Sequence, residues 1–484
     1  GVLNTDANVY GSFSFAGGFP RRTPKWQIIR ELEKQYDVEQ VAPDGPIDRS
    51  RYNVLLAILP SSLTTPQMAN LVNYVKSGKP VLIFDDPLPV NLPGAAPHQP
   101  KPPPGGGMGG MMGMQGRQPA QPKASGGKAT TLIDALDLEW TYDEIVWAKF
   151  NPHPQFEHVR EEIVFVSAAS DNVNSFHADS PVTQGLQEVV LFFPGEVTQK
   201  KSTLRFQSLL QTDEASGSHA WDDLIESGFG GTQLKQDPRR VPDKYAKQVA
   251  FHISGRREKA STSESKKDMP PSNEGEEINC IFVADIDLIS DQMFMMREQG
   301  LRPSEEADPI EFDNVTFVLN AVDVLVGDTD LVSLRTRRAR HRTLSTVEEK
   351  KSDSLKLQLR EQDEAVKKFE KRLEDKQAEL DVEVKSIREN KQLDETARVR
   401  LMEMAEERKN EELRQETKTI EQERRHDLRL IRNRTEQEVR RIESTYKWTG
   451  ILLPLIPAIL LGLLFLFRRA ANEQQNISPD RRRS

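Results

Sequence analysis

Continuous apolar runs alternate with helix-like segments near the start of the chain. Residues 54–59 (VLLAIL) and 81–84 (VLIF) are uninterrupted apolar runs, which are typical of strands buried on both faces of a parallel sheet. Between them, Pro66 suits the first turn of a helix, and Gly78 suits its end. A strand, a helix and a strand with short connections predict a right-handed parallel unit. We therefore expect an α/β head with a mostly parallel sheet.

The pattern continues after a polar interruption. An apolar helix is predicted at 314–326, where it would close the core, and Gly327 would end it. Further apolar runs predict strands at 163–166, 189–193, 203–211, 247–253 and 280–284. The predicted organisation is a head in two parts (1–86 and 131–334), a Pro/Gly/Met-rich disordered insertion (87–130), a flexible loop (254–277), a stalk (335–447), a transmembrane helix (448–467) and a short basic tail (468–484).

The stalk has the pattern of a long charged helix. The stretch from Asp328 to Thr449 contains neither Gly nor Pro. Around residues 388–398 the apolar register is lost, so a bend near Asn390 would produce an antiparallel hairpin. Apolar residues recur at a seven-residue spacing at Leu359, Val366, Leu373, Leu380 and Ile387. This periodicity predicts a coiled coil, through which the chain could form homo-oligomers. It leaves a single rod, a hairpin and a solvated helix with ion pairs four residues apart all open.

The stalk leads into an uncharged apolar segment at 448–467. This segment is long enough to span the hydrocarbon core of a bilayer. Trp448 begins it, in keeping with an interfacial aromatic belt, and Phe467 ends it before Arg468 and Arg469. The two prolines inside it can kink a membrane helix. We expect one membrane span, whose direction is not decided by the basic residues because they flank both ends.

Charge and cysteine content restrict the partners. The net charge is −9, and acidic residues exceed basic ones in 1–334 but not in 335–484. An acidic head is a poor match for nucleic acid or anionic lipid, so we expect no nucleic-acid partner. Cys280 is the one cysteine, which excludes an intramolecular disulfide, and its apolar run predicts core packing rather than nucleophilic use. Because the sequence starts with Gly1 rather than Met, we expect an upstream segment.

Motifs for catalysis are missing from the sequence. It has no phosphate-binding loop, no dinucleotide fingerprint and no G-x-S-x-G elbow. His153 and His158 lie in an irregular segment without ligand spacing. We therefore expect no catalytic residue, no cofactor and no metal. The thioether sulfurs of a methionine cluster in the insertion could bind a soft metal, although low-complexity sequence explains the cluster more simply. The cluster consists of Met108, Met111, Met112 and Met114.

One acidic group could form a ligand pocket. Asp285, Asp287 and Asp291 follow the apolar run 280–284. The carboxyl ends of parallel strands are where α/β folds place their binding sites. Helix capping and solubility are the simpler explanation for the three residues.

Five stretches resemble one protein family. They are PKWQIIRELEKQYDVEQV, VLLAILPSSLTTPQMANLVNYVKSGKPVLIFDDP, DSPVTQGLQEVVLFFPG, VADIDLISDQMF and FVLNAVDVLVGDTDLVSLRTR. Together with the charged coil and the C-terminal span, they are similar to the GldG-like, gliding-motility-type auxiliary components of ABC transport systems. The resemblance implies a class I glutamine-amidotransferase-like head without its catalytic Cys. It also implies an extracytoplasmic head, tethered to the cell (inner) membrane beside an ABC permease and a separate ABC ATPase. The insertion after Asp86 departs from the family pattern.

The leading hypothesis is a non-enzymatic, membrane-anchored accessory subunit of an ABC-type system, with a head that binds a partner protein or cargo. Two alternatives belong to other classes. One is a ligand-binding or hydrolytic α/β enzyme that uses Asp285 and Asp287. The other is a structural coiled-coil tether.

Overall fold

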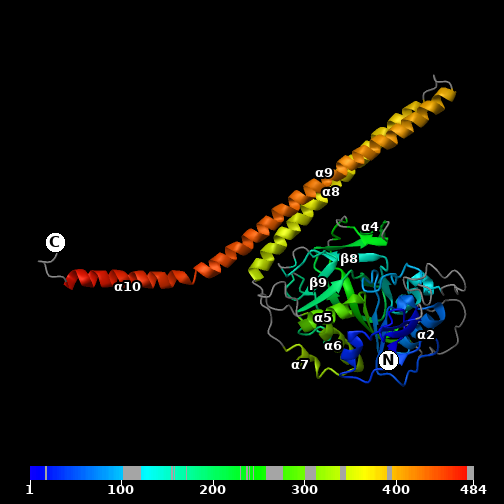
Figure 1. The fold of residues 1–484 in the computed structure, drawn as a ribbon, viewed down its shortest axis with the longest axis horizontal. Coiled ribbons are helices and arrows are strands. Elements are labelled where there is room, and N and C mark those ends of the chain that lie inside the picture. Colours follow the sequence, from blue (N-terminus) through cyan, green and yellow to red (C-terminus); the bar gives the residue numbers. More distant parts are fainter. Residues whose placement is uncertain are drawn as a thin grey trace. The chain divides into compact units, whose positions relative to one another are not determined.

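The protein is described by a computed structural model that divides into two compact units, Gly1–Arg342 and Thr343–Ser484. Each unit is described by itself below (Figure 1). The residues whose structure is described are 1–16, 19–101, 122–153, 156, 159–170, 172–228, 231–235, 238, 240–243, 245–257, 276–299, 312–337, 345–389 and 395–476.

A seven-stranded mixed sheet forms the centre of the first unit, the head. The strand order is β12 (Arg205–Gln211), β16 (Gln248–Arg257), β17 (Glu276–Val283), β6 (Val81–Phe84), β5 (Leu55–Ile58), β1 (Val2–Leu3) and β4 (Gln40–Val41). The last five strands in this order pair in parallel, whereas β16 pairs antiparallel with both β12 and β17. β5 and β6, predicted from their apolar runs, are buried at every residue. The expected mostly parallel α/β sheet is confirmed.

Helices cover both faces of this sheet. The connections β1–α1–β4 and β5–α2–β6 move outward in opposite directions from a point between β1 and β5. Because such connections are right-handed, α1 and α2 lie on opposite faces. Figure 1 shows α2 on one side of the sheet and α5 and α6 on the other. The bounds are α1 (Gln27–Leu32), α2 (Thr65–Val75), α3 (Thr130–Ala135), α5 (Asp291–Gln299) and α6 (Asn314–Val326). The chain reverses its direction of winding between β1 and β5, which makes this a topological switch point.

Short antiparallel pairs make up much of the rest of the head. They are β9 (Ile163–Ser167) with β10 (Glu188–Phe192), β7 (Leu138–Trp140) with β11 (Val197–Gln199), β8 (Glu144–Ala148) with β13 (Ser216–Ala220), β14 (Ile225–Gly228) with β15 (Gly231–Leu234), and β2 (Ser12–Ala16) with β3 (Phe19–Thr23). The short helices are η1 (Pro60–Ser62), η3 (Ala124–Gly127), α4 (Trp221–Leu224), η5 (Asp287–Ile289) and α7 (Val332–Arg335).

Both ends of the predicted insertion 87–130 are packed structure. Leu88, Ala96 and Ala124 are buried, and the ammonium of Lys123 donates to the carbonyls of residues 95 and 96, at 3.2 and 2.8 Å. A few apolar side chains therefore hold the flanks against the head even though the overall composition is that of a disordered segment. Residues 102–121, with the methionine cluster, lie outside the described residues.

The predicted flexible loop 254–277 is also shorter than its composition indicates. β16 continues to Arg257 and β17 begins at Glu276, and these two residues face each other in the ladder. Arg257 also donates to Asp137, with its Nε 2.9 Å from Oδ1. Charged residues thus extend the hairpin because they pair with charged neighbours, and the part of the loop at 258–275 lies outside the described residues.

Two long helices dominate the second unit. α8 (Ser345–Glu389) and α9 (Glu395–Leu452) lie side by side in Figure 1. Lys350 Nζ lies 2.9 Å from the Tyr446 hydroxyl, and Arg372 Nη1 lies 2.7 Å from Glu423 Oε2. Because an earlier residue of α8 pairs with a later residue of α9, the helices run antiparallel. Of the three arrangements left open by the sequence, the antiparallel pairing of α8 and α9 is that of the hairpin, and residues 390–394 lie outside the described residues.

The apolar segment after the stalk is helical and exposed. α9 ends at Leu452 and α10 (Leu455–Asn476) begins three residues later. The helix breaks at Pro454, because proline has no N–H to donate to the preceding turn. Within the described residues, one helical segment is long and apolar enough to cross a membrane, and none of its apolar window is buried inside the protein. A soluble core helix would be buried, so this exposure suits a membrane anchor.

Candidate functional site

Three buried carboxyl groups meet at the carboxyl edge of the central sheet. Asp86 follows β6, and Asp285 and Asp287 follow β17. β6 and β17 are parallel neighbours with Phe84 opposite Val283, so the residues that come after them lie close together. A carboxylate oxygen from each of the three residues lies within 4.8 Å of the other two. None of the three residues has any solvent exposure.

Backbone N–H groups bind the first two carboxylates. Asp285 accepts from the N–H of Phe192 at 2.8 Å, from that of Asp287 at 2.7 Å and from that of Leu288 at 3.1 Å. Asp86 accepts from the backbone N–H groups that follow each strand, those of residues 88 and 286, at 2.7 and 3.0 Å. These bonds connect the end of β10 with the ends of β6 and β17, because each of the three segments contributes a donor.

Asp287 binds the insertion flank to the same edge. Its Oδ2 accepts from the N–H of Val90 at 2.8 Å, and its Oδ1 accepts from the side-chain amide of Asn91 at 2.6 Å. The flank therefore crosses the carboxyl ends of β6 and β17. The acidic group thus acts as a cross-link between three segments of the chain: the end of β10, the segment after β17, and the segment after β6 that begins the insertion.

Burial changes the ionisation of the group. Desolvation by burial, together with the neighbouring charges of Asp287 and Asp285, raises the pKa of Asp86 well above its usual range. Burial and Asp287 likewise raise the pKa of Asp285. Burial raises the pKa of Asp287 to about 6, against the opposing effect of its bond with Asn91. Such a group holds protons near neutral pH.

The chemistry available to this group is limited by its hydrogen bonds. Three carboxylates offer the oxygen ligands that a hard cation such as Ca²⁺ or Mg²⁺ prefers. Here those oxygens accept from backbone and amide N–H groups, which makes a stabilising role the simplest function of the cluster. Asp86, Asp285 and Asp287 are the described residues that could hold a metal.

Asp291 does not join the other two predicted pocket residues. It begins α5, is exposed, and accepts from the N–H of Gln27 at 2.7 Å, at the contact between α5 and α1. Asp86 takes its place in the cluster. The sequence contains the signal for this, because the apolar run of β6 ends in two aspartates just as the run of β17 ends in Asp285.

The topological switch point is also filled by the chain itself. At the end of β5, Ser61 donates to Asp85 from its N–H at 2.8 Å and from its hydroxyl at 2.6 Å. Lys101, from the insertion flank, lies 3.1 Å from Asp6 and donates to the carbonyl of Ser62 at 3.2 Å. Open α/β sheets bind ligands at such a point. In this head an internal lysine supplies the positive charge there.

Comparison with known proteins identifies the family. A family described as an ABC-type uncharacterized transport system matches residues 1–321, which is most of the chain. The chain belongs to this family of ABC transport auxiliary components. The match ends inside α6, so it covers most of the head and does not include α7, α8, α9 or α10. No curated protein and no solved structure matches the chain.

The remaining residues weighed for chemistry in this auxiliary protein have structural positions. Cys280 is fully buried on β17, and burial raises the pKa of its thiol well above the usual range, so it is a core residue as expected. His153 Nε2 lies 2.6 Å from Glu188 Oε1, beside the ring of Phe165. His158 lies outside the described residues.

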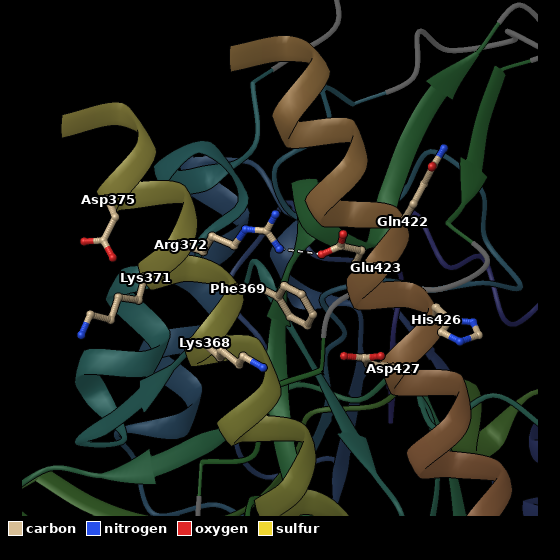
Figure 2. A pocket seen from close by; sticks show the side chains of 9 residues that line it. All are labelled: Lys368, Phe369, Lys371, Arg372, Asp375, Gln422, Glu423, His426 and Asp427. Atoms are coloured by element: carbon tan, nitrogen blue, oxygen red, sulfur yellow. Dashed lines mark hydrogen bonds and ion pairs between the residues drawn. The ribbon is translucent and has the colours of Figure 1, made fainter. Parts of the chain in front are cut away.

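A groove of about 620 Å³ lies between the two stalk helices. Figure 2 shows Phe369 pointing from α8 towards α9, while Arg372 reaches across to Glu423. Phe369 is buried in the contact between the helices. The lining combines this ring with charged side chains: Lys368, Phe369, Lys371, Arg372, Asp375, Gln422, Glu423, His426 and Asp427. The groove belongs to the contact that holds the hairpin together.

The four residues expected to bound the membrane span lie in two successive helices, α9 and α10. Trp448 is exposed near the end of α9, and Phe467 is exposed in α10. Arg468 and Arg469 follow in the same helix. An exposed apolar segment bounded by an aromatic residue and by two arginines is the arrangement of an interfacially bounded span.

Proposed function

We propose that the chain is a membrane-anchored, non-enzymatic accessory subunit of an ABC-type transport system, and that its head binds a partner protein or cargo. The observation that carries this proposal is the family match over residues 1–321. A permease and a separate ATPase would complete the system, because this sequence contains no phosphate-binding loop. Energy from ATP would then reach the head through its partners.

The chemistry of the head supports a binding role. In α/β enzymes the carboxyl ends of the strands and the switch point hold substrates. Here Asp285 and Asp287 bind the chain's own N–H groups, and Lys101 binds at the switch point. Both places serve internal contacts, which leaves the outer surface of the head as the region for recognition.

The second unit supports a tethering role. The exposed apolar helix supplies the anchor, and α8 and α9 form the stalk, for which we propose coiled-coil packing and self-association. The GldG-like resemblance further motivates an extracytoplasmic head on the inner membrane and a part in gliding-type systems. It also motivates a class I glutamine-amidotransferase-like ancestry, in keeping with the mostly parallel sheet.

One observation favours a second candidate, a hydrolase. Buried carboxyl groups with raised pKa values can act as general acids near neutral pH. If Asp285 and Asp287 catalysed a reaction, the Asp287→Asn chain would lose that activity and keep its fold. A folded Asp287→Asn chain that keeps its membrane partners and shows no lost activity supports the accessory role.

Affinity purification of the full chain from native membranes tests the proposal. We expect an ABC permease and an ABC ATPase to co-purify with the tagged chain, as identified by mass spectrometry, and not with an unrelated single-span protein carrying the same tag. The purified chain alone should not hydrolyse ATP. Hydrolysis at a rate typical of ABC ATPases, or the absence of any ABC subunit from repeated purifications, would overturn the proposal.

A further inference from the structure

A polar cavity opens on the head away from the carboxylate cluster. Its volume is about 340 Å³. The lining comes from β7, β8, β11 and β13 and from the segment just before β16. The lining residues are Glu139, Thr141, Glu144, Glu196, Thr198, Ser218, Asp243, Tyr245 and Lys247. None of the residues expected from the sequence to form a site takes part in it.

The lining carries excess negative charge. Four of its side chains are carboxylates, and Lys247 is the one base. The buried Lys247 ammonium is already paired, with Nζ 2.6 Å from Glu196 Oε2, 2.7 Å from Asp243 Oδ2 and 2.8 Å from the Tyr245 hydroxyl. Although burial opposes its charge, these bonds raise the pKa of Lys247, so it stays protonated. One ammonium cannot balance four carboxylates, and the cavity stays acidic.

Glu196 is the deepest acid and is incompletely bonded. Its side chain is 7% exposed, and its Oε1 has no hydrogen-bond partner among the described residues. Burial raises the pKa of Glu196 despite the neighbouring Lys247, and the charges of Asp243 and Glu144 act in the same direction as burial. A buried acceptor without a donor is costly. A ligand that brings donors and positive charge would relieve this cost.

An aromatic ring stands at the edge of the cavity. Tyr245 is half-exposed, and the ammonium of Lys247 lies 4.3 Å from its ring centre. Exposed Val241 lies four residues before it. Aromatic faces beside carboxylates recognise ammonium and guanidinium groups through cation–π attraction combined with charge-assisted hydrogen bonds.

The geometry disfavours a bare metal ion. Within the described residues, the acidic side chains that converge on one point are those of Asp86, Asp285 and Asp287, and not those of this cavity. Carboxylates spread over a larger volume suit a group with several donors. A guanidinium, with five N–H donors in a rigid plane, can bridge acids that one small ion cannot.

We propose that this cavity binds the guanidinium or ammonium group of a ligand. The group would enter beside Tyr245, stand among Glu139 and Glu144, and direct donors towards Glu196. Its source is the arginine or lysine side chain of a partner or cargo segment, or a free amine such as arginine itself. This inference rests on the proposed function of the head as a binding module and names the chemistry that it recognises.

Fluorescence anisotropy with the full chain in detergent micelles tests the cavity. The probe is the fluorescein-labelled peptide Gly-Ser-Arg-Gly-Ser, compared with the same peptide carrying neutral citrulline. We expect saturable binding of the arginine peptide, and we expect the citrulline peptide to bind at least about tenfold more weakly. If arginine amide displaces the labelled peptide as effectively as the unlabelled peptide does, the ligand is assigned to a free amine. If arginine amide displaces it less effectively, the ligand is assigned to a side chain within a peptide.

Two variants connect the binding to this cavity. The double variant Glu139→Gln, Glu144→Gln removes two charges while keeping the size of the side chains, and should weaken the arginine peptide about tenfold or more. Tyr245→Leu removes the ring and should weaken it several-fold. The matched control is Asp37→Asn, an exposed acid outside the cavity, which should bind as the unaltered chain does.

Equal binding of both peptides, or equal binding by the double variant and the Asp37→Asn control, would overturn the inference. Such a failure is distinguishable from failure of the proposed function, because co-purification of ABC subunits does not depend on these peptides. If ABC subunits co-purify and the peptides do not bind, the cavity inference alone is wrong. If the arginine peptide binds at the cavity and no ABC subunit co-purifies, the proposed function alone is wrong.

Discussion

Raising the pH from 5 to 8 should destabilise the head through Asp85. This carboxyl group is fully buried at the end of β6, and burial raises its pKa to about 7, against the opposing hydrogen bonds from Ser61. In the unfolded chain the same group titrates near its ordinary pKa of about 3.9. Between these two values the folded protein holds a proton that the unfolded chain has lost. The stability contributed by this proton is therefore present at low pH and is lost as the pH rises towards 7.

The magnitude follows from the pH interval. Between pH 5 and the folded pKa of about 7, roughly two pKa units at about 1.4 kcal/mol each give a loss of about 3 kcal/mol. His98 and His252 act in the opposite direction, because burial lowers their pKa and favours folding as the pH rises. The difference between the unaltered chain and Asp85→Asn removes their effect. That difference in the free energy of unfolding should fall by about 3 kcal/mol from pH 5 to pH 8.

Urea unfolding of the full chain in detergent micelles, followed by tryptophan fluorescence, measures this difference. Trp140 and Trp147 are buried in the head and report its unfolding. Asp37→Asn serves as the control, because it removes an exposed carboxylate and should keep the pH dependence of the unaltered chain. Identical pH dependence in the unaltered chain and Asp85→Asn, or a difference that grows with pH, would refute the reasoning.

Three further predictions concern the ends of the head, the stalk and the anchor. Arg335→Ala removes the ion pair with Asp323 of α6 and should lower the free energy of unfolding in urea by about 2 kcal/mol. The control, Arg337→Ala at an exposed position, should change it by less than about 0.5 kcal/mol, and equal effects of the two variants would contradict the pairing. Phe369→Ala should weaken the α8–α9 contact by about 3 kcal/mol and lower the midpoint of thermal unfolding of the helices, followed by circular dichroism. Lys371→Ala, at an exposed position, should leave that midpoint unchanged, and equal midpoints for the two variants would contradict the contact. Leu460→Arg places a charge in the apolar segment at a cost of about 3 kcal/mol and should reduce the fraction of chain that resists alkaline extraction from membranes; an unaltered chain already extracted by that wash would exclude the anchor.

The central strands were predictable because strands buried on both faces consist of apolar residues throughout. β5 and β6 are covered on both faces, so each is a continuous apolar run that needs no knowledge of its neighbours. The extension of the β16–β17 pairing over residues 254–257 and 276–279 was not predictable in this way. These residues include charged ones whose composition is typical of a loop, but they pair across the strands, as Arg257 does with Glu276.

The candidate sites show the same limit. Asp285 and Asp287 stand out because they follow an apolar run, but Asp86 joins them only once β6 and β17 are known to be neighbours, across 200 residues of sequence. The acidic cavity has no local signal at all. Glu196 and Lys247 come from segments 51 residues apart, and only the tertiary fold brings them into contact.

Photocrosslinking from the head in native membranes tests the central claim most directly. The full chain would carry a photoreactive phenylalanine analogue at Tyr245 or at exposed Val173, with an exposed position on the stalk, Leu357, as the comparison. We predict adducts from at least one head position with a subunit or cargo of an ABC transport system, identified by mass spectrometry. Adducts with ABC subunits from the stalk alone, and none from either head position, would contradict the account and favour a tether.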